Sequence, residues 1–271
     1  MAQISSLRAQ DLLRSGKYDV LIAECRQRLL ANPEDRVAIA WMATADRDKG
    51  DYGEALRLFE RLAVYHREDK VANRAAPGNP VYRIDIACLH WLLRDYSTAI
   101  AQMHGLAAGI LDRSIKYADA AGGMKQGLLL YYMAVTAKIP EESSYALDYL
   151  RNRLNRLRAI LRKSLIGFWP CPVAEYLLGD VGFDAVMEGV NDRSIKIALP
   201  DAEARHELGR RNMLSLALFY DGVKSRTRGD EAHCLTRMRE CYSLERHMSE
   251  WYLGRYEIQQ ADKETFDREW L

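Results

Sequence analysis

The residues best suited to bind a metal ion lie near the C-terminal end of the chain, at His233, Cys234, Cys241 and His247. Structural zinc sites usually pair their ligands at short spacings, and these four residues do not. Cys234 and Cys241 are seven positions apart, a spacing that places both on one buried face of a helix. We therefore expect no metal site. The thiols are expected to be reduced and mostly buried at Cys25, Cys88, Cys171, Cys234 and Cys241.

A glycine-rich run has residue types found in phosphate-binding loops, Gly122-Gly123-Met124-Lys125-Gln126-Gly127. It lacks the GxxxxGK[ST] order, and no strand is predicted before it, so we interpret it as a break in a helix. The chain also lacks the GxSxG, kinase, Rossmann and Cys–His signatures. The sequence therefore predicts neither a cofactor nor a catalytic residue. The rival hypothesis is a helical enzyme whose site residues are dispersed along the chain.

One predicted helix is strongly basic, with Arg151, Arg153, Arg156, Arg158, Arg162 and Lys163. A solvated face opposite a leucine stripe explains this pattern. That stripe consists of Leu147, Leu150, Leu154, Leu157 and Leu161. The functional alternative is a docking surface for an acidic partner or a phosphate backbone. Interleaved aromatic residues, which would stack on single-stranded nucleic acid, are missing, so a protein partner is favoured.

The helices that would position these residues recur along the chain. Gly16-Lys17-Tyr18 and Gly50-Asp51-Tyr52 are 34 residues apart, and an amphipathic helix follows each. A 34-residue period with a Gly-x-Tyr corner resembles the tetratricopeptide repeat (TPR). The resemblance implies an all-α, TPR-like solenoid of antiparallel helical hairpins, because one hairpin cannot bury its own apolar face.

The remaining chain continues this pattern less regularly, and we interpret residues 1–271 as a single helical-repeat domain. Residues 1–110 would form three hairpins, with an inserted Pro-rich loop near 67–80. Residues 111–200 would form long and degenerate hairpins, including a helix over 114–137 interrupted at the glycine pair. Residues 201–271 would form a last hairpin and a capping helix. This C-terminal pattern and Trp169-Pro170-Cys171-Pro172 resemble TPR proteins of the bacterial NlpI type, without the lipoprotein signal.

Composition and charge limit the classes of partner. The 271 residues are 48% hydrophobic and carry a net charge of +1, so no overall field favours nucleic acid or an anionic membrane. The N-terminal stretch has no apolar signal-peptide core, and no apolar run of 18 residues occurs. We therefore expect a cytoplasmic protein without a membrane partner.

In TPR proteins, the first helix of each repeat lines a concave groove that binds protein segments. Aligning this chain on its corners assigns seven candidate partner-binding residues to that groove. They are Gln10, Arg14, Thr44, Arg47, Asp48, Trp91 and Arg226. Trp and Arg are attractive anchors because they are enriched among the residues that dominate binding energy at interfaces. The alternative for Trp91 is packing beneath the next repeat. The basic helix is the second choice for docking.

The irregular repeats, the inserted loop and the missing export signal resemble small cytoplasmic TPR proteins found beside bacterial polymorphic toxins, such as those of contact-dependent growth inhibition. This resemblance implies an immunity protein that binds and neutralises a cognate toxin domain. The alternatives are a secretion or assembly chaperone and a general protein-interaction adaptor. A preformed concave scaffold suits each of these roles, because it reduces the ordering cost of binding.

Overall fold

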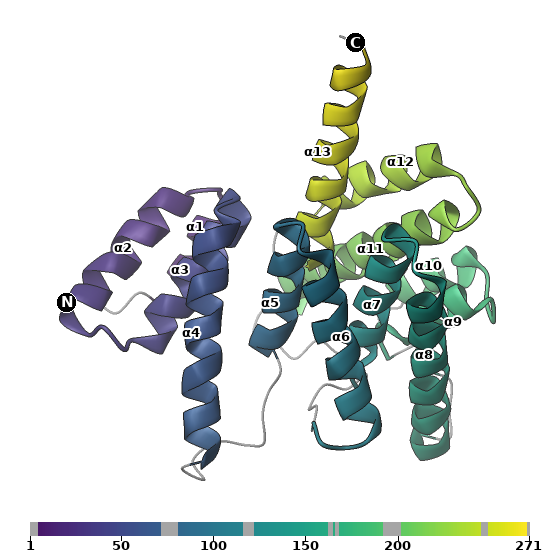
Figure 1. Cartoon of the computed structure of the whole chain (residues 1–271), viewed down its shortest axis with the longest axis horizontal. Helices are drawn as coiled ribbons and strands as arrows, with labels where there is room; N and C mark the ends of the chain where they lie inside the picture. Colours follow the sequence, from purple (N-terminus) through teal and green to yellow (C-terminus); the bar gives the residue numbers. More distant parts are fainter. Residues whose placement is uncertain are drawn as a thin grey trace. The chain divides into compact units, whose positions relative to one another are not determined.

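The computed structural model describes residues 5–71, 81–115, 122–161, 165, 168–191, 202–244 and 249–269. Within these ranges every regular element is an α-helix, which confirms the predicted all-α class (Figure 1). The helices are α1 (Ser6–Arg14), α2 (Tyr18–Ala31), α3 (Arg36–Lys49), α4 (Tyr52–Val71), α5 (Val81–Leu92), α6 (Tyr96–Leu111), α7 (Met124–Thr136), α8 (Pro140–Leu161), α9 (Cys171–Leu178), α10 (Phe183–Asn191), α11 (Ala202–Arg226), α12 (Glu231–Tyr242) and α13 (Ser249–Glu269).

Within the described ranges, six helix pairs are joined by the same type of tight corner. After α3, for example, Gly50 has φ = 106°, and its N–H donates to the carbonyl of Arg47 over 3.1 Å. The N–H of Asp51 then donates to the carbonyl of Asp46 over 2.8 Å. This Schellman geometry satisfies the last carbonyls of a helix and turns the chain back. The left-handed residues of the six corners are Gly16, Gly50, Arg94, Lys138, Gly179 and Gly229.

The chain divides into two compact units, Met1–Gln102 and Met103–Leu271, with the boundary inside α6. In unit 1, α2 packs on α3, α3 on α4 and α4 on α5. The interior is apolar because one face of each helix carries aliphatic residues, among them Leu21, Ile39, Leu58, Leu62 and Leu89. A buried ion-pair network also connects two helices of this unit. The Arg47 guanidinium pairs with Asp48 on α3 and, over 2.7 Å, with Asp85 on α5.

Unit 2 is built around α11, which packs against α7, α9, α10, α12 and α13. Its largest fully buried side chains are aromatic, at Tyr132, Tyr149, Phe219, Tyr220 and Tyr252. The leucine stripe of α8 faces inward as expected at Leu150, Leu154 and Leu157, whereas Leu147 is only half-buried. The side chain of Leu161 lies outside the described part.

Two elements differ from their expected boundaries. The inserted loop was expected over 67–80, but α4 continues to Val71, and residues 72–80 lie outside the described ranges. The helix expected over 114–137 is described only as α7, which begins after the glycine pair; residues 116–121 are also outside the described ranges. None of the described helices is both long enough and apolar enough to cross a membrane.

Candidate functional site

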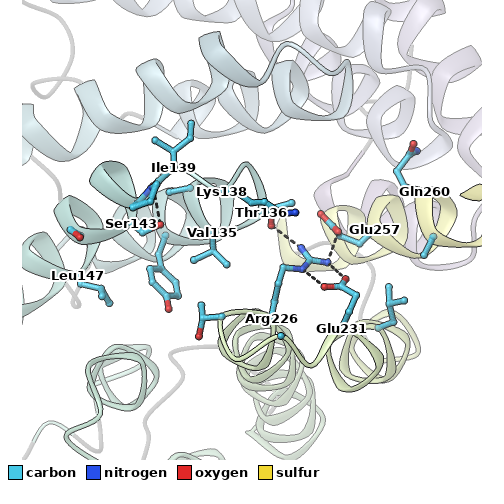
Figure 2. Close-up of a pocket in the computed structure, with 18 residues that line it drawn as sticks. Val135, Thr136, Lys138, Ile139, Ser143, Leu147, Arg226, Glu231, Glu257 and Gln260 are labelled. Atoms are coloured by element: carbon cyan, nitrogen blue, oxygen red, sulfur yellow. Dashed lines mark hydrogen bonds and ion pairs between the residues drawn. The ribbon is translucent and has the colours of Figure 1, made fainter.

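A cavity of about 1040 Å³ lies in unit 2, where two of the repeated corners meet α13. The C-terminal end of α7 and the first turns of α8 form one wall. The corner between α11 and α12, together with α13, forms the other wall (Figure 2). Helix ends carry backbone groups without intrahelical partners, and polar side chains often lie beside them. The two corners therefore bring polar groups to the cavity next to the apolar faces of the helices. The cavity therefore has both apolar and polar walls.

Arg226, the last residue of α11, connects both walls. Its Nη1 donates to Thr136 Oγ1 over 2.8 Å, and its Nη2 donates to Glu257 Oε2 over 2.9 Å (Figure 2). The same guanidinium binds both carboxylate oxygens of Glu231, over 2.9 and 2.6 Å. Glu257 Oε1 in turn accepts a hydrogen bond of 2.6 Å from the Tyr132 hydroxyl. One arginine thus ties α7, α11, α12 and α13 together.

This arginine hub, defined as Arg226 with Thr136, Glu231, Glu257 and Tyr132, is mostly shielded from water. The side chains of Arg226 and Glu257 are 13% and 10% exposed, whereas that of Glu231 is 54% exposed. Burial alone would lower the pKa of the Arg226 guanidinium, but the hydrogen bonds to Glu231 and the charge of Glu257 raise it above its usual value. The Arg226 guanidinium is therefore permanently charged, and it connects the two walls of the cavity.

The rest of the cavity lining is suited to contact rather than to acid–base chemistry. Half-buried aliphatic side chains line it at Val135, Ile139, Leu147 and Leu235. Hydroxyl groups of Ser143 and Ser144 and the exposed Lys138 lie nearby. Burial raises the pKa of the Tyr131 phenol, so this hydroxyl stays protonated at physiological pH. An apolar wall with a few placed polar groups is typical of a binding site.

A second polar cluster joins α9, α11 and α12 around the buried Asp221. Its carboxylate accepts hydrogen bonds from the Tyr176 hydroxyl over 2.6 Å and from Arg237 Nε over 2.7 Å. His233 Nε2 lies 3.1 Å from the same carboxylate. Burial raises the pKa of Asp221, but hydrogen bonds from Tyr176, His233 and Arg237 lower it overall. Three side chains from α9 and α12 converge on this one carboxylate of α11, so the cluster stabilises the helix packing.

The predicted partner-binding residues fall into different environments. Arg226 is the one that lines the described cavity of unit 2. The other six belong to unit 1, where Gln10 and Arg14 are exposed and Thr44 is half-buried. Arg47, Asp48 and Trp91 are 5%, 0% and 1% exposed. In the described structure their side chains serve the interior of unit 1, because Arg47 pairs with Asp48 and Asp85, and Trp91 packs on the Tyr96 ring with centroids 4.6 Å apart.

The basic helix, α8, does not present its arginines as one patch. Arg151 is paired with Asp148, and Arg158 is paired with Glu175; both arginines, like Arg156, are exposed. Arg153 instead is buried, with 8% exposure. Arg162 and Lys163 lie outside the described residues.

Sequence reasoning found Arg226 but not the residues that surround it. Thr136 and Glu257 are 90 and 31 positions away, and no local spacing connects them to α11. The left-handed corners at Lys138 and Gly229 bring these distant helix ends to the same cavity. Pro140 is the first residue of α8 at this wall, a position that suits the fixed φ of proline.

Within the described ranges, no group of three or more His, Cys, Asp or Glu side chains is arranged to hold a metal ion. All five cysteines are free and buried, in agreement with the sequence-based expectation. No protein-family model, curated protein or solved structure matches this chain. The fold and the cavity define its class as an all-helical protein built from hairpins with repeated corners.

Proposed function

We propose that this protein is a TPR-like helical scaffold and that its unit 2 cavity binds an exposed polypeptide segment of a partner protein. The observation that carries the proposal is the cavity of about 1040 Å³ between the α7–α8 corner, the α11–α12 corner and α13. Its volume slightly exceeds the usual range for small-ligand sites, roughly 300–1,000 Å³, and accommodates several side chains. The repeated corners support the TPR-like part of the proposal, because equivalent hairpins stack into solenoids with extended binding surfaces.

The chemistry of the lining favours a polypeptide over a reacting substrate. The charge of Arg226 is already balanced by the carboxylates of Glu231 and Glu257, so this arginine holds the cavity wall in place. It is therefore poorly suited to stabilise the negative charge of a reacting substrate. The aliphatic wall offers contact area to apolar side chains, and Ser143, Ser144 and Lys138 offer hydrogen bonds to a peptide backbone. We therefore propose binding rather than catalysis.

The test is selection of binding peptides from a displayed random library on the full chain. Ser144 is an exposed cavity residue of α8, and Asn155 is exposed on the same helix outside the cavity. Ser144→Trp should weaken the selected peptides by at least about tenfold by filling the cavity, whereas Asn155→Trp should leave their affinity unchanged. Peptides that bind both variants equally, or a selection that yields no peptide, would contradict the cavity assignment.

The narrower proposal is that the partner is a toxin domain and that the protein acts as a cytoplasmic immunity protein. Its support is the resemblance of the irregular repeats to such proteins. The alternatives are a secretion or assembly chaperone and an adaptor. Purified product of a neighbouring toxin gene should form a complex with the chain on size exclusion, and co-expression should rescue cells. Absence of both the complex and the rescue would eliminate the immunity role while leaving peptide binding testable by the selection above.

A further inference from the structure

A second feature of unit 2, separate from the cavity, is the glycine pair before α7. Gly122 and Gly123 both adopt left-handed conformations, with φ values of 61° and 86°. A Cβ on Gly122 would lie 2.6 Å from Arg153 Nη2, and a Cβ on Gly123 would lie 3.0 Å from the Tyr149 hydroxyl. The Tyr149 hydroxyl donates to the Gly123 carbonyl over 2.7 Å. Two successive turns of α8 therefore place Tyr149 and Arg153 directly on this glycine backbone.

Arg153 is an unusual residue for this position. It is 8% exposed, its Nε atom has no hydrogen-bond partner, and it forms no ion pair within the described part of the chain. A guanidinium always carries its charge, and a buried charge without compensation is unfavourable. The three other described arginines of α8 stand in contrast, because they are exposed and two of them pair with carboxylates. Arg153 is thus a buried positive charge without a counter-charge among the described residues.

The first turn of α7 adds donors and positive charge at the same corner. A helix leaves its first N–H groups without intrahelical partners, and no side chain caps α7. Acidic residues usually occupy this end because the helix dipole is positive there, but the first turn of α7 has none and carries Lys125 instead. Gln126 is fully buried, and neither of its side-chain amide atoms has a hydrogen-bond partner within the described chain.

We propose that this corner binds a phosphate group, held by the Arg153 guanidinium and the first N–H groups of α7. Two independent observations meet here. The N-terminus of α7 has no acidic cap. The buried Arg153, which has no partner among the described residues, lies against Gly122, two residues before that helix. Arg153 and Lys125 together carry two positive charges, which match a phosphate monoester dianion, whereas a carboxylate would balance only one of them. Arginine and helix N-termini both suit phosphate because they offer several N–H donors at once. The site differs from a phosphate-binding loop of the GxxxxGK[ST] type, because its arginine comes from the following helix.

The experiment measures binding of inorganic phosphate to the full chain by titration calorimetry. Wild-type protein should bind it saturably. Arg153→Gln should weaken binding by at least about tenfold, because it removes a charge-assisted contact. The matched control is Arg156→Gln, the same change at an exposed site on the same helix, which should leave affinity unchanged. Circular dichroism checks that each variant keeps its helical content.

A second measurement requires no variant. In ¹⁵N NMR spectra of the wild type, amide signals of Lys125 and Gln126 should shift with the same dissociation constant that calorimetry gives. Sulfate should compete with phosphate, and acetate should bind more weakly. The proposal is overturned if no saturable binding occurs, if Arg153→Gln binds as well as wild type, if acetate binds more tightly than phosphate, or if the amides of the first turn of α7 do not respond.

Discussion

Removal of the Glu257 carboxylate should destabilise unit 2 far more than removal of the Glu231 carboxylate, although both bind the same arginine. Glu257 is 10% exposed and binds both Arg226 and the Tyr132 hydroxyl. Glu257→Gln leaves a mostly buried guanidinium facing an amide, and breaking a buried pair costs about 3–5 kcal/mol. Because Arg226 keeps Glu231 and Thr136, we expect a smaller loss, about 2–3 kcal/mol. Glu231 is 54% exposed, so Glu231→Gln should cost less than about 1 kcal/mol.

Urea unfolding followed by circular dichroism measures both variants. A double-mutant cycle adds the single variant Arg226→Met and the double variant Arg226→Met with Glu257→Gln. The double variant should lose about 2 kcal/mol less stability than the sum of the two single variants, because no buried charge is then left without its partner. Equal costs for Glu257→Gln and Glu231→Gln would refute the reasoning, because burial would then make no difference to the pair. Full additivity in the cycle would show that Arg226 and Glu257 do not stabilise each other.

Three further predictions concern single residues. Burial and the charges of Asp51 and Glu54 raise the pKa of Asp46 to about 6. Between about pH 4 and 6 the folded state therefore keeps a proton on Asp46 that the unfolded state loses, so folding stability falls as pH rises through this window. Asp46→Asn should therefore raise the free energy of unfolding by about 2 kcal/mol at pH 7 and by almost nothing near pH 4, as measured by urea titration at both values; an equal gain at both would exclude this cause. The pKa of Asp221 is lowered in the folded state, so its contribution to folding stability is present above about pH 4 and is lost as pH falls through the folded-state pKa. Asp221→Asn should therefore lower the free energy of unfolding by about 2–4 kcal/mol at pH 7 and by progressively less in acid. A loss of stability that does not depend on pH would contradict the charge argument. Gly50 has φ = 106°, and a Cβ added there would meet no other atom, so Gly50→Ala should lower stability by about 1 kcal/mol through backbone strain alone. Gly53 lies within α4, so Gly53→Ala should raise stability by about 0.5–1 kcal/mol. Thermal melts in which both changes have the same sign would refute this prediction.

The sequence alone determined the features that depend on neighbouring residues. The repeated amphipathic pattern predicted helices, and Gly16 and Gly50 indicated corners because glycine adopts a left-handed conformation without steric cost. Lys138 gave no such signal, since nothing local favours a left-handed lysine; its conformation is held by the two helices that pack on either side of it.

Only the tertiary structure decided which polar side chains became interior. Arg47 was expected in a groove, but Asp85, 38 positions later, pairs with it inside unit 1. In the sequence Arg153 is one of six similar basic residues. The packing of α8 on the glycine pair buries Arg153 against Gly122, whereas Arg156 stays exposed. Helical spacing determines which residues share a face, but the helices that pack on that face come from distant parts of the sequence. For a charged residue, this packing determines whether its side chain is paired, exposed to solvent or buried without a counter-charge.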